Sequence, residues 1–306
     1  MIAASPISLD GKVVLITGGG RGIGREAALA MADAGASVVV NDIDADAARG
    51  AVAEIRESGG RATAHVGAIG PTAVAEGAVA TATDTFGRLD VVACNAGLLR
   101  DRTLWNTSDE DFDVVIETHL RGTFTCARAA VRHFREAGQG GRLILVSSIA
   151  GQRGNFGQTA YSAAKAGIAA LARTWSLELG RYSVTVNAIV PNALTVMTAT
   201  IPALKPFNEM IARGEPLPAK LRKDLGIGGP EDVAAAFVYL ASERSAGITG
   251  QCIGIGGDRL SIWSHPVEAA HRLSTGGWTA DALGDALEGP LSGALQDVGV
   301  DLKLAP

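Results

Sequence analysis

Short apolar runs alternate with stretches of helical spacing along the first 257 residues of the chain. Apolar runs of four to six residues between turn signals are typical of strands buried in a sheet. We predict strands at residues 13–16, 37–40, 61–66, 89–93, 142–146, 184–189 and 252–255. Helical spacing occupies residues 25–34, 45–58, 72–86, 109–137, 162–180 and 231–241. This alternation predicts an α/β fold, with a doubly wound parallel sheet of about seven strands and helices on both faces.

Two segments fall outside the alternation. Residues 192–229 form an excursion between a strand and a helix that is too long for an ordinary connection. Residues 258–306 follow the last predicted strand, and only 279–295 show weak amphipathic spacing. We therefore expect one domain over residues 1–257, with a substrate lid at 192–229, and a C-terminal extension over 258–306.

A glycine-rich turn follows the first predicted strand and opens the first helix. Residues 17–24 read TGGGRGIG. Gly18, Gly22 and Gly24 would let the backbone turn sharply and approach a pyrophosphate, which the N–H groups of the helix start would bind. We therefore expect a Rossmann-like dinucleotide site that Arg21 and Ile23 also contact. A plain structural turn is the alternative.

One acidic residue indicates which dinucleotide is bound. Asp42 ends the second predicted strand, where a carboxylate can accept hydrogen bonds from both adenosine ribose hydroxyls and would repel a 2′-phosphate. This predicts NAD rather than NADP. Arg21 is an argument for NADP, since a guanidinium near the ribose can hold a phosphate. Asp42 could instead cap the next helix, a role that Asp44 could fill equally well.

Three polar side chains form a predicted proton-transfer site. Tyr161 and Lys165 are four residues apart, so on a helix both project from one face. Ser148 ends the apolar run RLILVSS, thirteen residues before Tyr161. A hydroxyl, a phenol and an ammonium in one cleft can move a proton to or from a substrate oxygen. A surface Tyr–Lys pair and an ordinary strand-to-loop serine are the alternatives.

Five motifs give the chain a family resemblance. They are TGGGRGIG at 17–24, CNAG at 94–97, SS at 147–148, YSAAK at 161–165 and VNAIVP at 186–191. In order and spacing, over roughly residues 10–257, the chain resembles the short-chain dehydrogenase/reductase family. A closer likeness lies in residues 98–124, 154–165 and 191–198, which look like the (3R)-hydroxyacyl-CoA dehydrogenase domain of peroxisomal multifunctional β-oxidation enzymes.

The resemblance implies roles for individual residues. Tyr161 is expected to be the general acid/base, and Ser148 to hydrogen-bond the substrate oxygen. Lys165 is expected to hold the nicotinamide ribose and, with the positive nicotinamide, to lower the phenol pKa from its usual value near 10. Asn95 is expected near the adenosine ribose, and Gly97 where the backbone approaches the cofactor.

The chain also departs from the family pattern at three places. His119 stands where the family usually has an Asn that takes part in a proton relay to the Lys. We expect an imidazole to replace it in the relay, and a packed histidine is the alternative. Ala68 replaces the usual Asp against adenine. Val196 replaces a Thr that contacts the nicotinamide, which leaves the Leu194 backbone, Thr195 or Thr198 to take its place.

The predicted lid is rich in apolar side chains. They suit a long or bulky hydrophobic substrate, and they could equally belong to short helices that pack on the core: Met197, Ile201, Leu204, Phe207, Met210, Ile211, Leu217 and Leu221. Its cations could meet a CoA phosphate or form a solvated face: Lys205, Arg213, Lys220, Arg222 and Lys223. In the extension, Trp263, His265 and Trp278 could cover the cleft or a neighbouring subunit.

Composition narrows the class of protein. The 306 residues carry a net charge of −5 and no basic cluster, so we expect neither nucleic acid nor an anionic membrane as a partner. No apolar run approaches the roughly 18 residues of a membrane span. The three scattered cysteines favour reduced thiols over a disulfide framework or a metal site. The first residues do not resemble a signal peptide and LKLAP is no peroxisomal signal, so we expect the cytoplasm.

Together these observations predict an enzyme that oxidises a secondary alcohol with NAD. The expected substrate is a small-molecule hydrophobic alcohol or ketone, such as a 3-hydroxyacyl-CoA or a hydroxysteroid. The alternatives are an NADPH-dependent 3-oxoacyl thioester reductase, a lyase or epimerase with tightly bound NAD, and a non-catalytic NAD-binding regulator. The resemblance implies a homotetramer that pairs the helices at 109–137 and 162–180.

Overall fold

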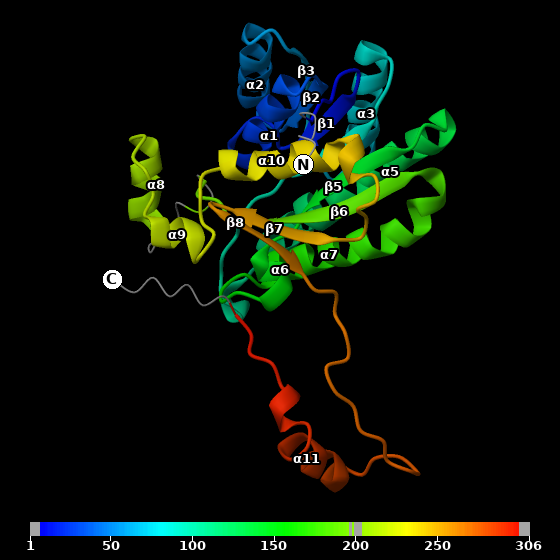
Figure 1. The fold of residues 1–306 in the computed structure, drawn as a ribbon, viewed down its shortest axis with the longest axis vertical. Coiled ribbons are helices and arrows are strands. Elements are labelled where there is room, and N and C mark those ends of the chain that lie inside the picture. The colour runs from blue at the N-terminus through cyan, green and yellow to red at the C-terminus, as the bar shows by residue number, and fades with distance from the viewer. Residues whose placement is uncertain (1–6, 196–197, 199–203, 300–306) are drawn as a thin grey trace, which may run out of the picture.

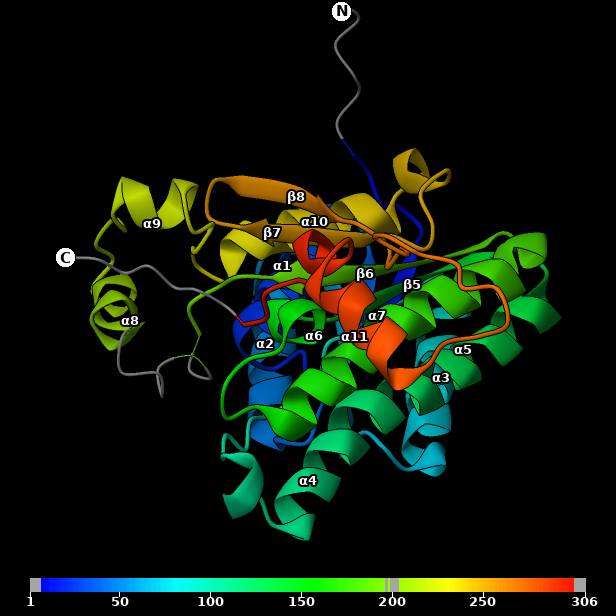
Figure 2. The same cartoon turned by 90° about the horizontal axis from the view of Figure 1, so that it is seen from below.

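One sheet runs through the protein, and helices cover both of its faces (Figures 1 and 2). The computed structural model describes residues 7–195, 198 and 204–299. The sheet has eight strands in the order β3-β2-β1-β4-β5-β6-β7-β8. Their bounds are β1 Val13–Thr17, β2 Ser37–Asp42, β3 Arg61–Val66, β4 Val91–Cys94, β5 Gly141–Val146, β6 Val184–Pro191, β7 Cys252–Gly256 and β8 Arg259–Trp263. The predicted α/β class and doubly wound parallel arrangement are confirmed.

The alternation of side chains along the strands separates two hydrophobic cores. Val14 and Ile16 on β1 face the core beneath α1 (Gly22–Asp33), α2 (Ala45–Glu57) and α10 (Glu231–Ala241). Val13 and Leu15 face the core beneath α3 (Thr72–Phe86), α5 (Gly122–Ala137) and α7 (Thr159–Leu179). Because neighbouring residues of a strand point to opposite faces, a run that is apolar throughout serves both layers.

The long helix predicted over 109–137 is interrupted. It consists of α4 (Asp109–Ile116), a π-helical turn (Glu117–Arg121) and α5. A π-turn inserts one extra residue and is frequent at functional sites. His119 lies within this turn and is buried, with 1% of its surface exposed.

The predicted lid folds largely onto itself. It contains α8 (Lys205–Ala212) and α9 (Ala219–Lys223). Leu194, Leu204, Leu221 and Ile227 are buried together, and Phe207, Ile211, Leu217 and Leu225 pack against them. The described apolar residues of the lid thus form a small core of their own, separate from the two cores under the sheet, and the short helices pack on this core and not on the main ones as the second interpretation expected. Val196, Met197 and Ile201 lie outside the described residues.

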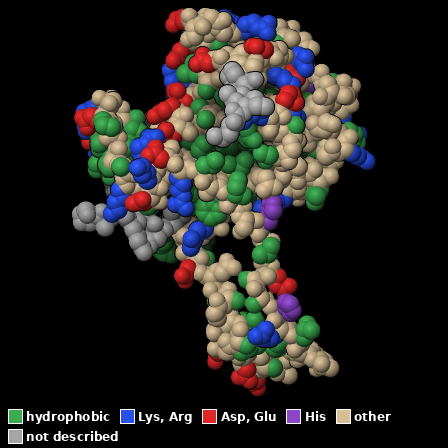
Figure 3. Space-filling view, viewed as in Figure 1, with side chains coloured by type: hydrophobic (Ala, Val, Ile, Leu, Met, Phe, Trp, Pro, Cys, Tyr) green, Lys and Arg blue, Asp and Glu red, His purple; other side chains and the backbone are tan. Residues whose placement is uncertain are grey.

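The expected count of about seven strands misses one strand, which lies in the predicted extension. β8 pairs antiparallel with β7, with Ile262 opposite Ile253, so the extension completes the edge of the sheet. Beyond Trp263 the chain leaves the body, forms α11 (Ala280–Glu288) and returns towards α6 (Ile149–Arg153), as Figure 1 shows. In the space-filling view of Figure 3 this part of the chain projects from the body. The weak amphipathic spacing at 279–295 contains α11.

Candidate active site

The predicted site residues gather at one edge of the sheet. The strand order reverses between β1 and β4, and parallel sheets of this kind bind ligands beyond the carboxyl ends of the strands at such a reversal. The glycine-rich turn follows β1, Asp42 ends β2, Asn95 follows β4 and Ser148 follows β5. The fold therefore brings together residues that lie more than a hundred positions apart in the sequence.

Three positions of the turn are glycines, each for a different steric reason. Gly18 has a φ of +61°, and a Cβ there would lie 2.7 Å from the Ala96 Cα. A Cβ on Gly24 would lie 2.1 Å from the carbonyl oxygen of Gly18. Gly22, at φ +53°, instead borders open space whose nearest atom is 3.8 Å away on Thr195. The first two close the turn, and the third leaves the room that a ligand needs.

The start of α1 is suited to an anion. Its N-cap residue, Arg21, makes no side-chain cap, so within the described residues no side chain occupies the first-turn N–H groups as a cap. These N–H groups and the positive end of the helix dipole fit a pyrophosphate. Ile23 contributes only its backbone there, because its side chain packs against the core under α1.

Asp42 lies directly beside this turn. Its carboxylate accepts hydrogen bonds from the N–H of Gly20 at 3.0 Å and from the N–H of Asp44 at 3.0 Å. Asp44, not Asp42, caps α2 by accepting from the N–H groups of Asp46 and Ala47. Asp44 also forms an ion pair with the guanidinium of Arg21. Arg21 is the cation that would favour NADP, and its charge is thus already paired. The residues present thus fit a dinucleotide with an unphosphorylated ribose.

Asn95 fixes β4 to the glycine-rich turn. Its side-chain amide donates to the carbonyl oxygens of Thr17 and Gly18 at 3.1 and 3.0 Å, and its N–H donates to the Thr17 hydroxyl at 3.0 Å. The structure shows a reason for a glycine at position 97 that differs from the predicted one. A Cβ on Gly97 would lie 2.2 Å from Cε1 of His119. The missing side chain therefore makes room for the imidazole as well as keeping the loop close to the cleft.

Ser148 and Tyr161 meet at the carboxyl end of β5. Ser148 is the N-cap of α6 and accepts from the N–H of Ala150 at 3.2 Å. Burial raises the pKa of the Tyr161 phenol, its hydrogen bond with Ser148 lowers it, and the negative charge of Asp101 raises it, with a net upward shift. In the chain itself burial outweighs the influence of Ser148, and the lowering expected from Lys165 together with the positive nicotinamide stays a prediction.

Lys165 lies one helical turn beyond Tyr161 and is buried. Its Nζ is 5.6 Å from the centre of the Tyr161 ring and donates to the carbonyl oxygen of Val146 at 2.6 Å. Burial lowers the pKa of Lys165 to about 7. Ser147 supports this arrangement, since its hydroxyl donates to the Lys165 carbonyl at 2.8 Å and ties α7 to β5.

His119 lies against the other side of Tyr161. The two rings are edge to face, with centroids 5.2 Å apart. Nε2 of His119 is 2.8 Å from the carbonyl oxygen of Leu98 and 3.0 Å from its N–H, while Nδ1 is buried without a hydrogen-bond partner among the described residues. Burial and then the charge of Lys165 lower the pKa of His119 to about 3, so the ring is neutral.

Sequence reasoning missed three connected residues in the loops near Tyr161, which are Asp101, Asn155 and Gln158. The side-chain amide of Gln158 donates to the carboxylate oxygens of Asp101 at 3.1 and 3.3 Å, and Asn155 donates to the Gln158 oxygen at 3.0 Å. The backbone N–H of Arg102 donates to the carbonyl of Gly157 at 2.8 Å, which joins the two loops. No periodicity marks these residues, although Gln158 directly precedes the helix that carries Tyr161.

The segment after β6 reaches the cleft beside Gly22. The N–H of Leu194 donates to the carbonyl of Gly228 at 2.8 Å, so a backbone contact of Leu194 with a cofactor would use its carbonyl. The N–H of Thr195 donates to the Thr198 hydroxyl at 2.7 Å. Ala68, where an adenine contact was expected to be lost, is exposed after β3.

The described residues provide neither a membrane-spanning helix nor a metal site. Over residues 7–195, 198 and 204–299, no helix is long and apolar enough to cross a membrane. Within the same ranges, no group of three or more His, Cys, Asp or Glu side chains could hold a metal ion. Cys94, Cys126 and Cys252 are free and buried, so they form no disulfide.

Comparison with known proteins supports the resemblance. A family model described as "Enoyl-(Acyl carrier protein) reductase" matches residues 18–257. Mouse peroxisomal multifunctional enzyme type 2 is 47% identical over 207 residues, which are 65% of this chain and 28% of that enzyme. The chain therefore spans about a quarter of the mouse enzyme's length.

Two further proteins match over most of their length. A hydroxyacyl-CoA dehydrogenase of Mycobacterium tuberculosis is 39% identical, with 89% of this chain and 86% of that protein covered. The crystal structure of a short chain dehydrogenase from Mycobacterium avium has a TM-score of 0.82 and 39% identity, with 95% and 98% of the two chains covered. The fold, the arrangement of the site and these matches together establish that the chain belongs to the short-chain dehydrogenase/reductase family of oxidoreductases.

Proposed function

We propose that the protein interconverts a secondary alcohol and a ketone with NAD, on a bulky hydrophobic substrate such as a 3-hydroxyacyl-CoA or a hydroxysteroid. The observation that carries the proposal is the placement of the Tyr161 phenol beside Ser148, with Nζ of the buried Lys165 5.6 Å from the Tyr161 ring centre and the turn that fits a pyrophosphate at the same edge of the sheet. The Mycobacterium tuberculosis relative named a hydroxyacyl-CoA dehydrogenase favours the acyl-CoA substrate over the steroid.

The chain's own residues divide the work of the reaction. The Ser148 hydroxyl donates to the substrate oxygen and stabilises the charge that develops on it. Tyr161 takes the hydroxyl proton in oxidation and returns it in reduction. When bound, the nicotinamide ring accepts the hydride that leaves the carbinol carbon. Glycines 18, 22 and 24, Arg21, Asp42, Asn95 and the carbonyl of Leu194 would hold the dinucleotide.

Lys165 and His119 set the state of the phenol. The raised pKa of Tyr161 means that the phenolate needs positive charge nearby, and we propose that Lys165 supplies it in its protonated form, together with the positive nicotinamide. His119 stays neutral and therefore adds no charge. Its unpartnered Nδ1 is the atom through which we propose that it joins a proton relay.

The preference for NAD rests on Asp42. Its carboxylate faces the turn while Arg21 is paired with Asp44. A Thermotoga maritima relative named 3-oxoacyl-[acyl-carrier-protein] reductase, 35% identical over 250 residues, favours a second candidate, an NADPH-dependent reductase of 3-oxoacyl thioesters. Comparing kcat/KM for NAD with 3-hydroxyacyl-CoA against NADPH with 3-oxoacyl-CoA separates the two. Net formation of NADH from the alcohol excludes a lyase or an epimerase that retains its NAD.

We further propose a cytoplasmic homotetramer. The free, buried thiols are consistent with a reducing compartment. Phe124 on α5 and Leu177 on α7 expose 41% and 86% of their surface, which is apolar surface that a second subunit would cover. Light scattering on the purified protein measures the mass, and a monomer would contradict the proposal.

A further inference from the structure

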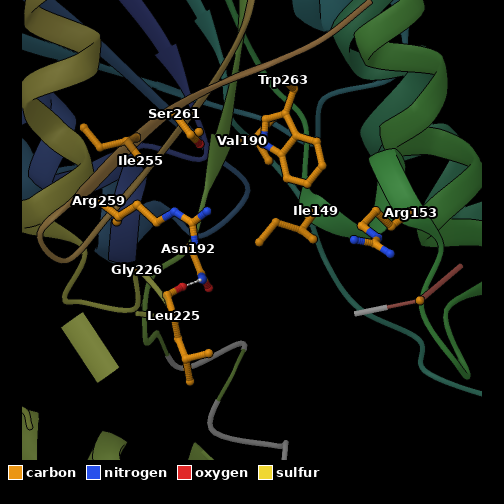
Figure 4. Close-up of a pocket in the computed structure, with 13 residues that line it drawn as sticks. Ile149, Arg153, Val190, Asn192, Leu225, Gly226, Ile255, Arg259, Ser261 and Trp263 are labelled. Carbon is orange, nitrogen blue, oxygen red and sulfur yellow. Dashed lines mark hydrogen bonds between the residues drawn. The ribbon is translucent and has the colours of Figure 1, made fainter. Parts of the chain in front are cut away.

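A pocket lies beside the catalytic residues, at the carboxyl ends of β6 and β7. Its volume is about 260 Å³, and Val190, Asn192 and Ile255 line it from the sheet. Ile149, which follows Ser148, lines it on the catalytic side, and Trp263 of β8 lines it on the side of the extension. Figure 4 shows the Trp263 ring directed into the pocket, opposite Ile149. The pocket therefore continues the site at Ser148 towards the extension.

Two arginines enter this pocket from different elements. Arg153 ends α6, five residues after Ser148, and Arg259 begins β8. In Figure 4 the guanidinium of Arg259 points inward from the strand, and that of Arg153 points inward from the opposite wall. The apolar side chains of Ile149 and Trp263 line the same pocket, and both arginines are exposed, so a ligand can reach them from solvent.

Neither arginine has a carboxylate partner in the part of the chain that the structure describes. Arg259 donates to the carbonyl oxygen of Asp224 at 3.0 Å, and Arg153 donates to that of Asp297 at 3.5 Å. The carboxylates of Asp232 and Asp258 are both bound by Arg222. Two uncompensated guanidiniums in one pocket repel each other, which an oxyanion between them would reverse.

The lid arginines expected to meet a CoA phosphate do not share this arrangement. Arg222 is occupied by its two carboxylates, and Arg213 pairs with Glu215 at 2.7 Å. Arg153 and Arg259, in contrast, pair with backbone carbonyls and with no carboxylate of the described residues. The extension thus supplies one half of a cationic pair that the lid does not provide.

We propose that Arg153 and Arg259 bind an oxyanion carried by the substrate, either a phosphate of its thioester carrier or a carboxylate on its acyl chain. This inference rests on the proposed function, because it assigns the substrate class of that same site. It makes the two arginines specificity residues, and it gives β8 a role in substrate recognition. Guanidinium binds phosphate and carboxylate through the same paired N–H groups, so the geometry fits both.

The test compares substrates that differ only in charge. The variants are Arg153→Met, Arg259→Met and the double variant. Arg61→Met is the matched control, since Arg61 is exposed on β3 at the opposite edge of the sheet. NADH formation is followed with a 3-hydroxyacyl-CoA, with the N-acetylcysteamine thioester of the same acid, which lacks phosphates, and with a CoA thioester that carries a terminal carboxylate.

If the oxyanion is a phosphate, the ratio of kcat/KM for the CoA thioester to that for the N-acetylcysteamine thioester falls about 10-fold for each arginine removed (about 1.4 kcal/mol). If it is a carboxylate, the ratio of the carboxylated to the neutral CoA thioester falls instead. Arg→Lys variants should recover part of either loss. Ratios that remain within twofold of the wild-type values in all variants would overturn the inference.

Direct binding separates this inference from the proposed function. Calorimetry with free coenzyme A and with glutarate, in the presence of NAD, needs no turnover. A wild-type protein that oxidises no thioester yet binds one of these probes, with about 10-fold weaker binding for each Arg→Met variant, would refute the proposed reaction and keep the oxyanion site. Equal binding by the wild type, the double variant and Arg61→Met would refute the site.

Discussion

The imidazole of His119 and the phenol ring of Tyr161 meet edge to face, with centroids 5.2 Å apart and planes at 85°. His119 projects from the π-helical turn between α4 and α5, and Tyr161 from the start of α7. The contact places a neutral, buried ring against the proposed acid/base. Protonation of His119 is therefore less favourable in the folded chain than in the unfolded chain.

Replacing His119 should change how stability depends on pH. The pKa of His119 is about 3 in the folded chain against an ordinary 6.5. Below pH 6.5 the His119 side chain binds a proton in the unfolded chain but not in the folded chain. The contribution of the neutral His119 to the free energy of unfolding, which is complete above pH 6.5, is therefore lost as the pH falls. Between pH 7.5 and 5.5 the wild type should lose about 1.4 kcal/mol more than His119→Asn. Urea unfolding at both pH values, at fixed protein concentration, measures this, and equal losses would show that His119 is not held neutral.

Removing the phenol oxygen should abolish turnover. Tyr161→Phe keeps the ring that contacts His119 but loses the group proposed to take the substrate proton. We expect kcat to fall by about 10²–10⁴, the range for loss of a general acid/base. Fluorescence titration with NADH should show retained cofactor binding. Turnover near the wild-type rate would remove Tyr161 from the proposed role.

Asp101 should tune the pH dependence of that step. Its negative charge contributes to the raised pKa of Tyr161, after burial, the largest cause. Asp101→Asn keeps an oxygen that can accept from Gln158 but removes the charge, so the pKa of the phenol should fall. The rising limb of kcat/KM for oxidation, measured against pH, should then move to lower pH. Asp84→Asn, on the exposed side of α3, removes the same charge far from the site and should leave the profile in place.

Gly97 should be intolerant of a side chain because of His119. A Cβ at Gly97 would lie 2.2 Å from the imidazole, so Gly97→Ala must displace either the ring or the loop. Overpacking of this kind costs about 1–3 kcal/mol, and a shift of about 1 Å near the chemistry costs about 100-fold in rate. Gly97→Ala with His119→Ala should recover stability relative to Gly97→Ala alone. Gly50→Ala, at an open helical position, should be neutral or slightly stabilising in thermal unfolding.

The hydrophobic periodicity predicted the parallel strands and the helices on both faces, but it did not predict β8, the edge strand of the sheet. The apolar runs fixed the parallel strands because a strand buried on both faces is apolar throughout. β8 has an exposed face, with Leu260 70% exposed, so its pattern is weaker. A signal was nevertheless present: Gly257 and Asp258 form a two-residue connection between β7 and β8, and Gly257 has a φ of +49°.

A site residue could be predicted from the sequence only where both its side-chain type and its spacing from other motifs indicated a role. The glycine turn, Asp42, Ser148, Tyr161 and Lys165 carry their roles in residue type and position, and the fold places them at one edge. The sign of the Tyr161 pKa shift was not predictable, because it depends on burial and on Asp101, a residue of another loop. Arg153 and Arg259 were likewise hidden, since α6 and β8 meet only in three dimensions.

Asp42 should decide which dinucleotide is used. A carboxylate that accepts from both ribose hydroxyls makes two charge-assisted hydrogen bonds, so Asp42→Ala should lower kcat/KM for NAD by about 10- to 100-fold and raise the relative use of NADP. Asp42 also accepts from the N–H groups of Gly20 and Asp44, and the variant could lose activity by loosening the turn. Asp42→Asn retains an acceptor oxygen without the charge and separates these effects.

Adding Asp44→Ala frees Arg21 from its ion pair, so the double variant Asp42→Ala, Asp44→Ala should use NADP better than Asp42→Ala does. A wild type that prefers NADP would overturn the role proposed for Asp42, and a double variant with no gain over Asp42→Ala would show that Arg21 does not face the ribose.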